Sequence, residues 1–141
     1  MKDLLSLKKN TMTLKETIAA VEEFHTAFGI ANNYTPTVEL TEAEMELRFR
    51  LMQEENEEYL EAAKNGDIVE IADALGDQLY ILCGTILKHG LQHKIVEVFQ
   101  EIQRSNMSKL DADGKPIYRE DGKVMKSELY FRPDIHTILT K

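Results

Sequence analysis

One stretch of the sequence, from Ile68 to about His89, limits the fold more than any other because it is apolar on nearly every side. Read as a helix at about 100° per residue, it spreads aliphatic side chains around most of its circumference. These residues are Ile68, Val69, Ile71, Ala72, Leu75, Leu79, Ile81, Leu82, Ile86 and Leu87. A helix that is apolar all round is normally buried. We therefore expect other helices to surround this one.

The rest of the chain carries start and stop signals for further helices. Thr13 with Glu16, and Thr41 with Glu44, have the spacing of capping boxes, and Asp67 can cap the apolar helix. Three of the helices are followed by a glycine, which suits a left-handed cap: Gly29, Gly66 and Gly90. The expected helices span residues 13–28, 41–65, 67–89 and about 92–105.

The remaining tail differs in character from the helical part. "DADGKP" and "EDGK" are turn signals, and residues 116–125 could form a small hairpin. Four helices with short connections predict an all-α four-helix bundle. We expect a single domain over residues 1–141, with a helical core at about 13–105 and a tail at 106–141.

Charge and composition exclude several classes of protein. A formal net charge of −8 argues against binding of a nucleic-acid backbone, and no apolar run is long enough for a membrane span. The single cysteine, Cys83, excludes a disulfide framework and fits a reducing cytoplasm. The first ten residues are too mixed for a signal peptide, so we expect a cytoplasmic protein.

Carboxylates occupy apolar sectors of two consecutive helices. With Glu54 at zero on the second helical wheel, Glu58 falls at about 40° and Glu55 at about 100°, among the apolar side chains. On the third helix, the three acids gather in one arc about 60° wide: Glu70, Asp73 and Asp77. Isolated buried carboxylates are costly, so inward acids are paired or bind a metal. An all-oxygen set suits a hard cation, Mg²⁺ or Mn²⁺.

The order of these motifs resembles a known family. "EENEE" followed by "EIAD" looks like the E-E-x-x-E … E-x-x-D signature of the MazG-like all-α nucleoside triphosphate pyrophosphohydrolases. That superfamily includes dUTPase-like and dCTPase enzymes and phosphoribosyl-ATP pyrophosphohydrolase. The resemblance extends from "EEFHTAFG" through "RSNMSKL" to "GKVMK" and "YFRPD".

The resemblance implies Mg²⁺-dependent hydrolysis between the α- and β-phosphates, giving a nucleoside monophosphate and pyrophosphate. It implies that the metal ligands are Glu55, Glu58, Glu70 and Asp73, with Mn²⁺ as a substitute for Mg²⁺. Glu54 matches the remaining acid, a general base or a ligand to a further ion; the catalytic candidates are thus Glu54 and Glu55. The candidates for substrate binding are Asn106, Lys109 and Lys126 at the phosphates, and Phe24, His25 and Asp77 at the base and sugar.

Several alternatives stay open on the residues. "FHTAFG" with "SNMSK" looks most like the dUTPase-like branch, which puts dUTP first, a dCTPase or broad-specificity enzyme close behind, and phosphoribosyl-ATP hydrolysis later. Glu22 and His25 form one E-x-x-H pair, so a non-enzymatic or di-iron carboxylate bundle is the alternative of a different class. The excess apolar surface of residues 67–89 favours a homodimer or a larger homo-oligomer.

Overall fold

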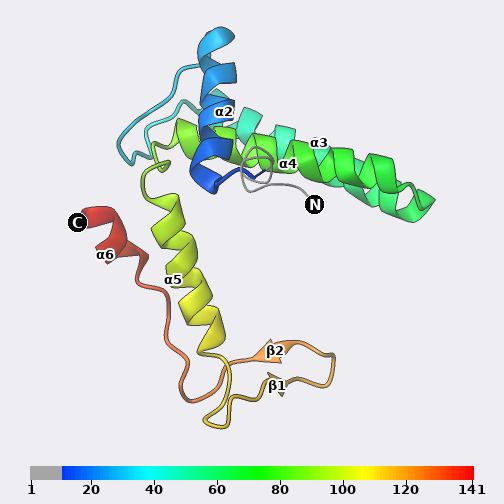
Figure 1. Cartoon of the computed structure of the whole chain (residues 1–141), viewed down its shortest axis with the longest axis vertical. Coiled ribbons are helices and arrows are strands. Elements are labelled where there is room, and N and C mark those ends of the chain that lie inside the picture. Colours follow the sequence, from blue (N-terminus) through cyan, green and yellow to red (C-terminus); the bar gives the residue numbers. More distant parts are fainter. Residues whose placement is uncertain (1–10) are drawn as a thin grey trace, which may run out of the picture. The chain divides into compact units, whose positions relative to one another are not determined.

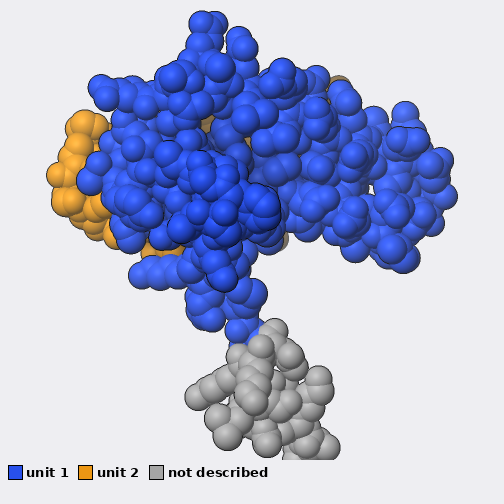
Figure 2. Space-filling model, turned by 90° about the horizontal axis from the view of Figure 1, so that it is seen from above, with its two compact units in different colours: residues 1–93 blue, residues 94–141 orange. Residues whose placement is uncertain are grey.

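The computed structural model describes residues 11–141 and consists mainly of helices (Figure 1). The first ten residues, for which the sequence predicts no signal peptide, lie outside the described part. The elements are α2 (Leu14–Ala27), α3 (Glu42–Asn65), α4 (Ile68–Lys88), α5 (Ile95–Met107), β1 (Ile117–Tyr118), β2 (Val124–Met125) and α6 (Ile135–Thr140). The chain divides into two compact units, residues 1–93 and 94–141 (Figure 2).

The helix boundaries of the first unit follow from the caps that the sequence predicts. Thr13 accepts a hydrogen bond from the backbone N–H of Glu16, whose carboxylate bonds back to Thr13, and Thr41 forms the same capping box with Glu44. Gly66 ends α3 in the left-handed conformation at φ 67°. This turn reverses the chain within a few residues, so that α3 and α4 lie side by side (Figure 1).

A glycine in α4 allows three helices to approach one another. A Cβ at Gly84 would lie 2.5 Å from Nη2 of Arg48, on α3, and 3.0 Å from Nε2 of His25, on α2. Arg48 uses this space to donate hydrogen bonds to Oγ1 of Thr85 at 2.9 Å and to the carbonyl of Ile81 at 2.6 Å. The guanidinium group thereby connects α3 to the C-terminal half of α4.

The loop between α2 and α3 is anchored at the same end of α4. Lys88 is buried; its Nζ donates to the carbonyl of Ala31 at 2.8 Å and pairs with Glu44 at 2.9 Å. Gly90, at φ 67°, lies so close to the loop that a Cβ there would be 2.0 Å from the carbonyl oxygen of Thr35. The C-terminal end of α4 is thus held by backbone contacts as well as by side chains.

Burial along α4 is uneven within a single copy of the chain. Apart from Ala74, its buried residues lie at the C-terminal end: Cys83, Gly84, Ile86, Leu87 and Lys88. Ile68 and Val69, in the first turn, remain 72% and 71% exposed. The first unit supplies only α2 and α3 as neighbours of α4 among its described residues, and two helices cannot cover an apolar surface that extends all round a third.

The second unit contains the helix and the hairpin that the sequence predicts, and one element that it does not. β1 and β2 pair antiparallel, with Ile117 opposite Met125, as the turn signals indicate. Ser105 and Ser108 hold the returning chain, because Ser105 Oγ donates to the carbonyl of Phe131 and Ser108 Oγ accepts from its N–H. The short α6, capped by Asp134, packs on α5.

The all-α fold with a C-terminal hairpin is therefore confirmed. α5 begins at Ile95, three residues later than the expected start near Gln92, because residues 92–94 form a turn. Between residues 11 and 141, no helix combines the length and apolar character of a membrane span.

Candidate metal centre

Three carboxylates from two helices converge at the middle of the α3–α4 pair. Glu55 and Glu58 are one turn apart on α3, and Asp77 faces them from α4. Each contributes one oxygen atom to a group whose members all lie within 4.8 Å of one another. The antiparallel packing of α3 on α4 brings these oxygens together.

The environment of Glu55 disfavours its charged form. Burial, a hydrogen bond shared with Glu58, and the negative charges of Glu58, Asp77 and Asp73 raise the pKa of Glu55 from 4.5 to about 7. Burial is the largest cause, and the remaining causes are all like-charge contacts or proton sharing. The cluster therefore retains a proton near neutral pH unless a positive charge replaces it.

One oxygen atom of the cluster has no donor when the carboxyl groups are all ionised. In that state no group among the described residues donates a hydrogen bond to Oε2 of Glu55, which is shielded from solvent. A buried acceptor left without a donor destabilises the folded state by about 1–3 kcal/mol. A small cation between the carboxylates would satisfy this oxygen and balance the charge. The residues thus fit a hard divalent cation, for which carboxylate oxygens are the usual ligands.

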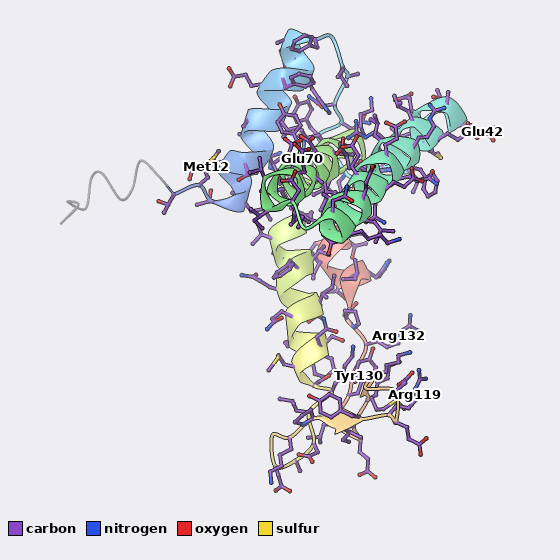
Figure 3. All side chains as sticks on the ribbon, turned by 90° about the vertical axis from the view of Figure 1, so that its right-hand side faces the viewer. Met12, Glu42, Glu70, Arg119, Tyr130 and Arg132 are labelled. Carbon is purple, nitrogen blue, oxygen red and sulfur yellow. The ribbon has the colours of Figure 1, made fainter. Side chains whose placement is uncertain are left out.

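A pocket of about 480 Å³ adjoins this cluster and shares Glu58 with it. Its lining consists of Glu58, Glu61, Ala62, Asn65, Asp67, Glu70 and Asp73. Glu70, labelled in Figure 3, belongs to the first turn of α4, where the side chain of Asp67 caps its backbone N–H at 3.2 Å. Three of the four expected ligands therefore line the pocket: Glu58, Glu70 and Asp73. Glu55 and Glu58 belong to the three-carboxylate cluster, so that Glu58 is common to both.

The other candidate site residues of the first unit lie outside the three-carboxylate cluster. Glu54 is exposed and is not a member of the cluster found among the described residues. Phe24 is 39% exposed, and its ring contacts that of Phe28, at 4.4 Å between centroids, and that of Tyr80, at 5.6 Å. His25 is buried at 3% exposure, and its Nδ1 donates to Oδ1 of Asn32 at 2.6 Å, so it has a local structural role.

Asn106, Lys109 and Lys126 all belong to the second unit. Asn106 is exposed near the end of α5, Lys109 is partly exposed after it, and Lys126 follows β2. Nζ of Lys126 lies 4.7 Å from the centroid of the Tyr130 ring, a cation–π contact. Their assignment to the phosphates depends on the sequence resemblance.

Asp77 lies nearer to the expected metal ligands than the resemblance implies, since the resemblance relates it to the base and sugar. The structure places its carboxylate directly with Glu55 and Glu58. The spacing of Asp73 and Asp77, one helical turn apart, was the available signal. The wheel of α4 alone could not show which of the two acids lies opposite Glu55, because that depends on how α3 and α4 align.

Comparison with known proteins agrees with this arrangement. The family model for phosphoribosyl-ATP pyrophosphohydrolase matches residues 21–106, which include the whole of α3 and α4. Comparison with curated proteins gives no match. Enzymes of the MazG-like superfamily typically depend on a divalent metal, in keeping with the cluster of Glu55, Glu58 and Asp77. The chain thus belongs to the phosphoribosyl-ATP pyrophosphohydrolase family, within the MazG-like superfamily of all-α pyrophosphohydrolases, which hydrolyse phosphoanhydrides.

Proposed function

We propose that this protein is a Mg²⁺-dependent nucleotide pyrophosphohydrolase that releases pyrophosphate and a nucleoside monophosphate from its substrate. The cluster of Glu55, Glu58 and Asp77, with its unpartnered Glu55 oxygen, is the observation that carries the proposal. Structural carboxylates would be paired with Lys or Arg, yet the described residues that line the cluster and the adjoining pocket include neither.

Glu55, Glu58 and Asp77 would hold the ion, with Asp73 and Glu70 facing the adjoining pocket, where a second ion or the substrate's own cation could bind. Bound Mg²⁺ would neutralise phosphate charge and lower the pKa of a water molecule. Glu55 has to lose its proton when an ion binds, because a protonated carboxyl group is a poor ligand. Glu54, exposed beside it, is the candidate general base.

Lys109 and Asn106 have the chemistry to hold the polyphosphate. An ammonium group supplies positive charge to a site whose own residues are acidic, and an amide can orient phosphate oxygens. Lys126 would assist them. Phe24, together with Tyr80, offers aromatic surface for a base. These assignments are supported by the match to the family signature.

Two substrates are favoured over the others, dUTP and phosphoribosyl-ATP. The "FHTAFG" and "SNMSK" segments favour dUTP, with dCTP and other nucleoside triphosphates next. The match of residues 21–106 to the phosphoribosyl-ATP pyrophosphohydrolase model supports phosphoribosyl-ATP equally well. Both substrates require the same cleavage, between the first and second phosphates from the sugar. If the substrate is dUTP or another nucleoside triphosphate, the protein would serve to remove unwanted nucleotides from the nucleotide pool.

We also propose a cytoplasmic location, supported by a buried, unpaired Cys83, and a homodimer or a larger homo-oligomer. A partner surface for nucleic acid is not expected from a net charge of −8.

A substrate panel tests the proposal directly. The purified protein is incubated with Mg²⁺ and with dUTP, dCTP, the common nucleoside triphosphates or phosphoribosyl-ATP, and the products are identified by ³¹P NMR. We expect pyrophosphate and the corresponding monophosphate, with turnover abolished by EDTA and restored by Mg²⁺ or Mn²⁺. Orthophosphate as the primary product, or turnover that persists in EDTA, would refute the mechanism.

A further inference from the structure

A small cavity lies in the first unit, between α2 and the turn that follows α4. It measures about 190 Å³ and is lined by Lys15, Ile18, Ala19, Glu22, Gln92 and His93. We call it the Gln92 cavity. None of these residues belongs to the three-carboxylate cluster or lines the pocket beside it. Pockets for drug-sized ligands measure about 300–1,000 Å³, so the Gln92 cavity suits a molecule smaller than a nucleotide.

Gln92 brings a buried acceptor without a donor to this cavity. Its side chain is 7% exposed, and Nε2 donates to the carbonyl oxygen of Asn33 at 2.8 Å. Oε1 is shielded from solvent and accepts no hydrogen bond within the described part of the chain. Exchanging the two ends of the amide would set two oxygen atoms against each other, so the orientation of the amide is fixed. A buried acceptor of this kind normally has a partner, and here the protein does not supply it.

The cavity also contains two opposite charges that are not paired with each other. Lys15 and Glu22 are seven residues apart on one face of α2, roughly 10 Å along the helix axis. Neither residue takes part in an ion pair among the described residues. Ile18 and Ala19 lie between them on the same face and line the cavity. The cavity therefore has a positive end and a negative end, separated by apolar side chains.

The two acceptors of the cavity are held in place by consecutive residues of the loop between α2 and α3. The hydroxyl group of Tyr34 donates to Oε1 of Glu22 at 3.2 Å, and the carbonyl group of Asn33 holds the amide of Gln92. The backbone N–H of Asn33 in turn donates to the carbonyl oxygen of Leu87 at 2.9 Å. The acceptors are thus positioned before any ligand arrives, which lowers the entropic cost of binding.

The chemistry of each end defines the ligand. An ammonium group suits the end with Glu22 and Gln92, because it donates several hydrogen bonds and carries a positive charge. A carboxylate suits the other end, where Lys15 offers its own ammonium group and His93 a ring N–H. A metal cation would satisfy the acceptors but would leave Lys15 without a function and close to a like charge. Since the charges of Lys15 and Glu22 balance, a ligand with no net charge fits best.

We propose that the Gln92 cavity binds a small zwitterion, an amino acid, with its ammonium group on Gln92 and Glu22 and its carboxylate on Lys15 and His93. The aliphatic part of the ligand would lie on Ile18 and Ala19. This site is separate from the candidate metal centre and does not depend on the proposed function. Binding would strengthen the attachment of the α2–α3 loop to the end of α4, because Gln92 connects the two.

A titration of the ¹⁵N-labelled full chain, followed by NMR, tests the proposal. The probes are 4-aminobutyrate and alanine, with butylamine and butyrate as controls that carry one charged group each. We expect saturable shifts of the Gln92 side-chain amide signals, and at least about 10-fold tighter binding of one zwitterion than of either control. Whichever zwitterion binds more tightly gives the spacing of its two charged groups. No saturable binding of either zwitterion, or equal affinity for a control, would overturn the proposal.

Substitutions at the two ends separate a ligand site from an ordinary surface hollow. Glu22→Gln and Lys15→Met should each weaken zwitterion binding at least about 10-fold while helicity is retained. Glu23→Gln and Lys64→Met are the matched controls, since both residues are exposed and outside the cavity lining, and binding should be unchanged. If the Lys15 side chain itself satisfies Gln92 in solution, Lys15→Met will lower the melting temperature of the ligand-free protein and no zwitterion will bind to the wild type. That result would overturn the proposal, and so would equal losses of affinity in the variants and their controls.

Discussion

Replacing Glu55 by glutamine should stabilise the metal-free protein at neutral pH, whereas most substitutions at partly buried sites destabilise. The carboxyl group of Glu55 has a pKa of about 7 in the folded protein, against 4.5 as its ordinary value. A carboxyl pKa raised by folding means that the folded state holds the proton more tightly than the unfolded chain. The contribution of this proton to the free energy of unfolding is then fully present below pH 4.5, and it is lost as the pH rises through 7.

The size of the effect follows from this difference. At about 1.4 kcal/mol per pKa unit, the span from 4.5 to about 7 corresponds to at most about 3.5 kcal/mol of unfolding free energy. Glu58 is exposed and solvent screens part of the repulsion, so we expect about 1–2 kcal/mol at pH 7.5. For a chain of this length that is roughly 3–8 °C in melting temperature. Glutamine removes the charge and keeps the shape.

Melting curves followed by circular dichroism in EDTA provide the assay. At pH 7.5 Glu55→Gln should melt above the wild type, and at pH 4.5 the difference should disappear because Glu55 is then protonated in the wild type. Excess Mg²⁺ should reverse the order at pH 7.5, since binding at a hundredfold excess over Kd stabilises the wild type by about 2.7 kcal/mol.

Glu54→Gln is the matched control, because Glu54 is adjacent in sequence but lies outside the cluster among the described residues. Its melting temperature in EDTA should be close to that of the wild type at both pH values. A Glu55→Gln protein less stable than the wild type in EDTA would show that Glu55 is part of a structural pair. Equal responses of the two variants to pH and Mg²⁺ would refute the reasoning altogether.

Three further substitutions separate binding, substrate and folding roles. Asp77→Asn should weaken Mg²⁺ binding, measured by calorimetry, and lower turnover at least about 100-fold, whereas Glu57→Gln, on the polar side of α3, should change neither. Lys109→Ala should raise KM about 10-fold or more and should leave the Mg²⁺ affinity of the substrate-free protein unchanged. Lys123→Ala, in the hairpin turn, is the control for this variant. A fully active Lys109→Ala would refute the phosphate assignment. Gly90→Ala should lower the free energy of unfolding by about 2–4 kcal/mol, because the added Cβ would clash with the carbonyl of Thr35. Gly114 has a similar φ but open space around it, so Gly114→Ala should lower the free energy of unfolding by only about 1–2 kcal/mol. Equal losses for the two variants in chemical denaturation would show that the contact with Thr35 is unimportant.

Local signals in the sequence were sufficient for the helices and for part of the site. The capping boxes of Thr13 and Thr41 act within four residues, so they can be read without tertiary information, and both are present in the structure. The inward direction of Glu55 and Glu58 follows from the period of a single helix, and the structure places both in the cluster.

Features that depend on how elements align could not be read in this way. Asp77 joins the cluster because of the offset between α3 and α4, which no single helical wheel contains. The exposure of Leu75 depends on how many neighbours α4 has, and the six-residue α6 is too short to show a helical period. The roles of Glu54, Lys109 and Lys126 stay predictions, since they concern bound species.

The uneven burial of α4 implies a gradient of opening along one helix. Lys88 and Gly90 fasten its C-terminal end, while Ile68 and Val69 at the other end are largely solvated. In an isolated chain, backbone amides near Asp73 should exchange with solvent through local fraying, and amides near Leu87 only through global unfolding. The acids therefore belong to the half of the helix that opens locally more often. A bound ion would stabilise that half and selectively slow the hydrogen exchange of its backbone amides.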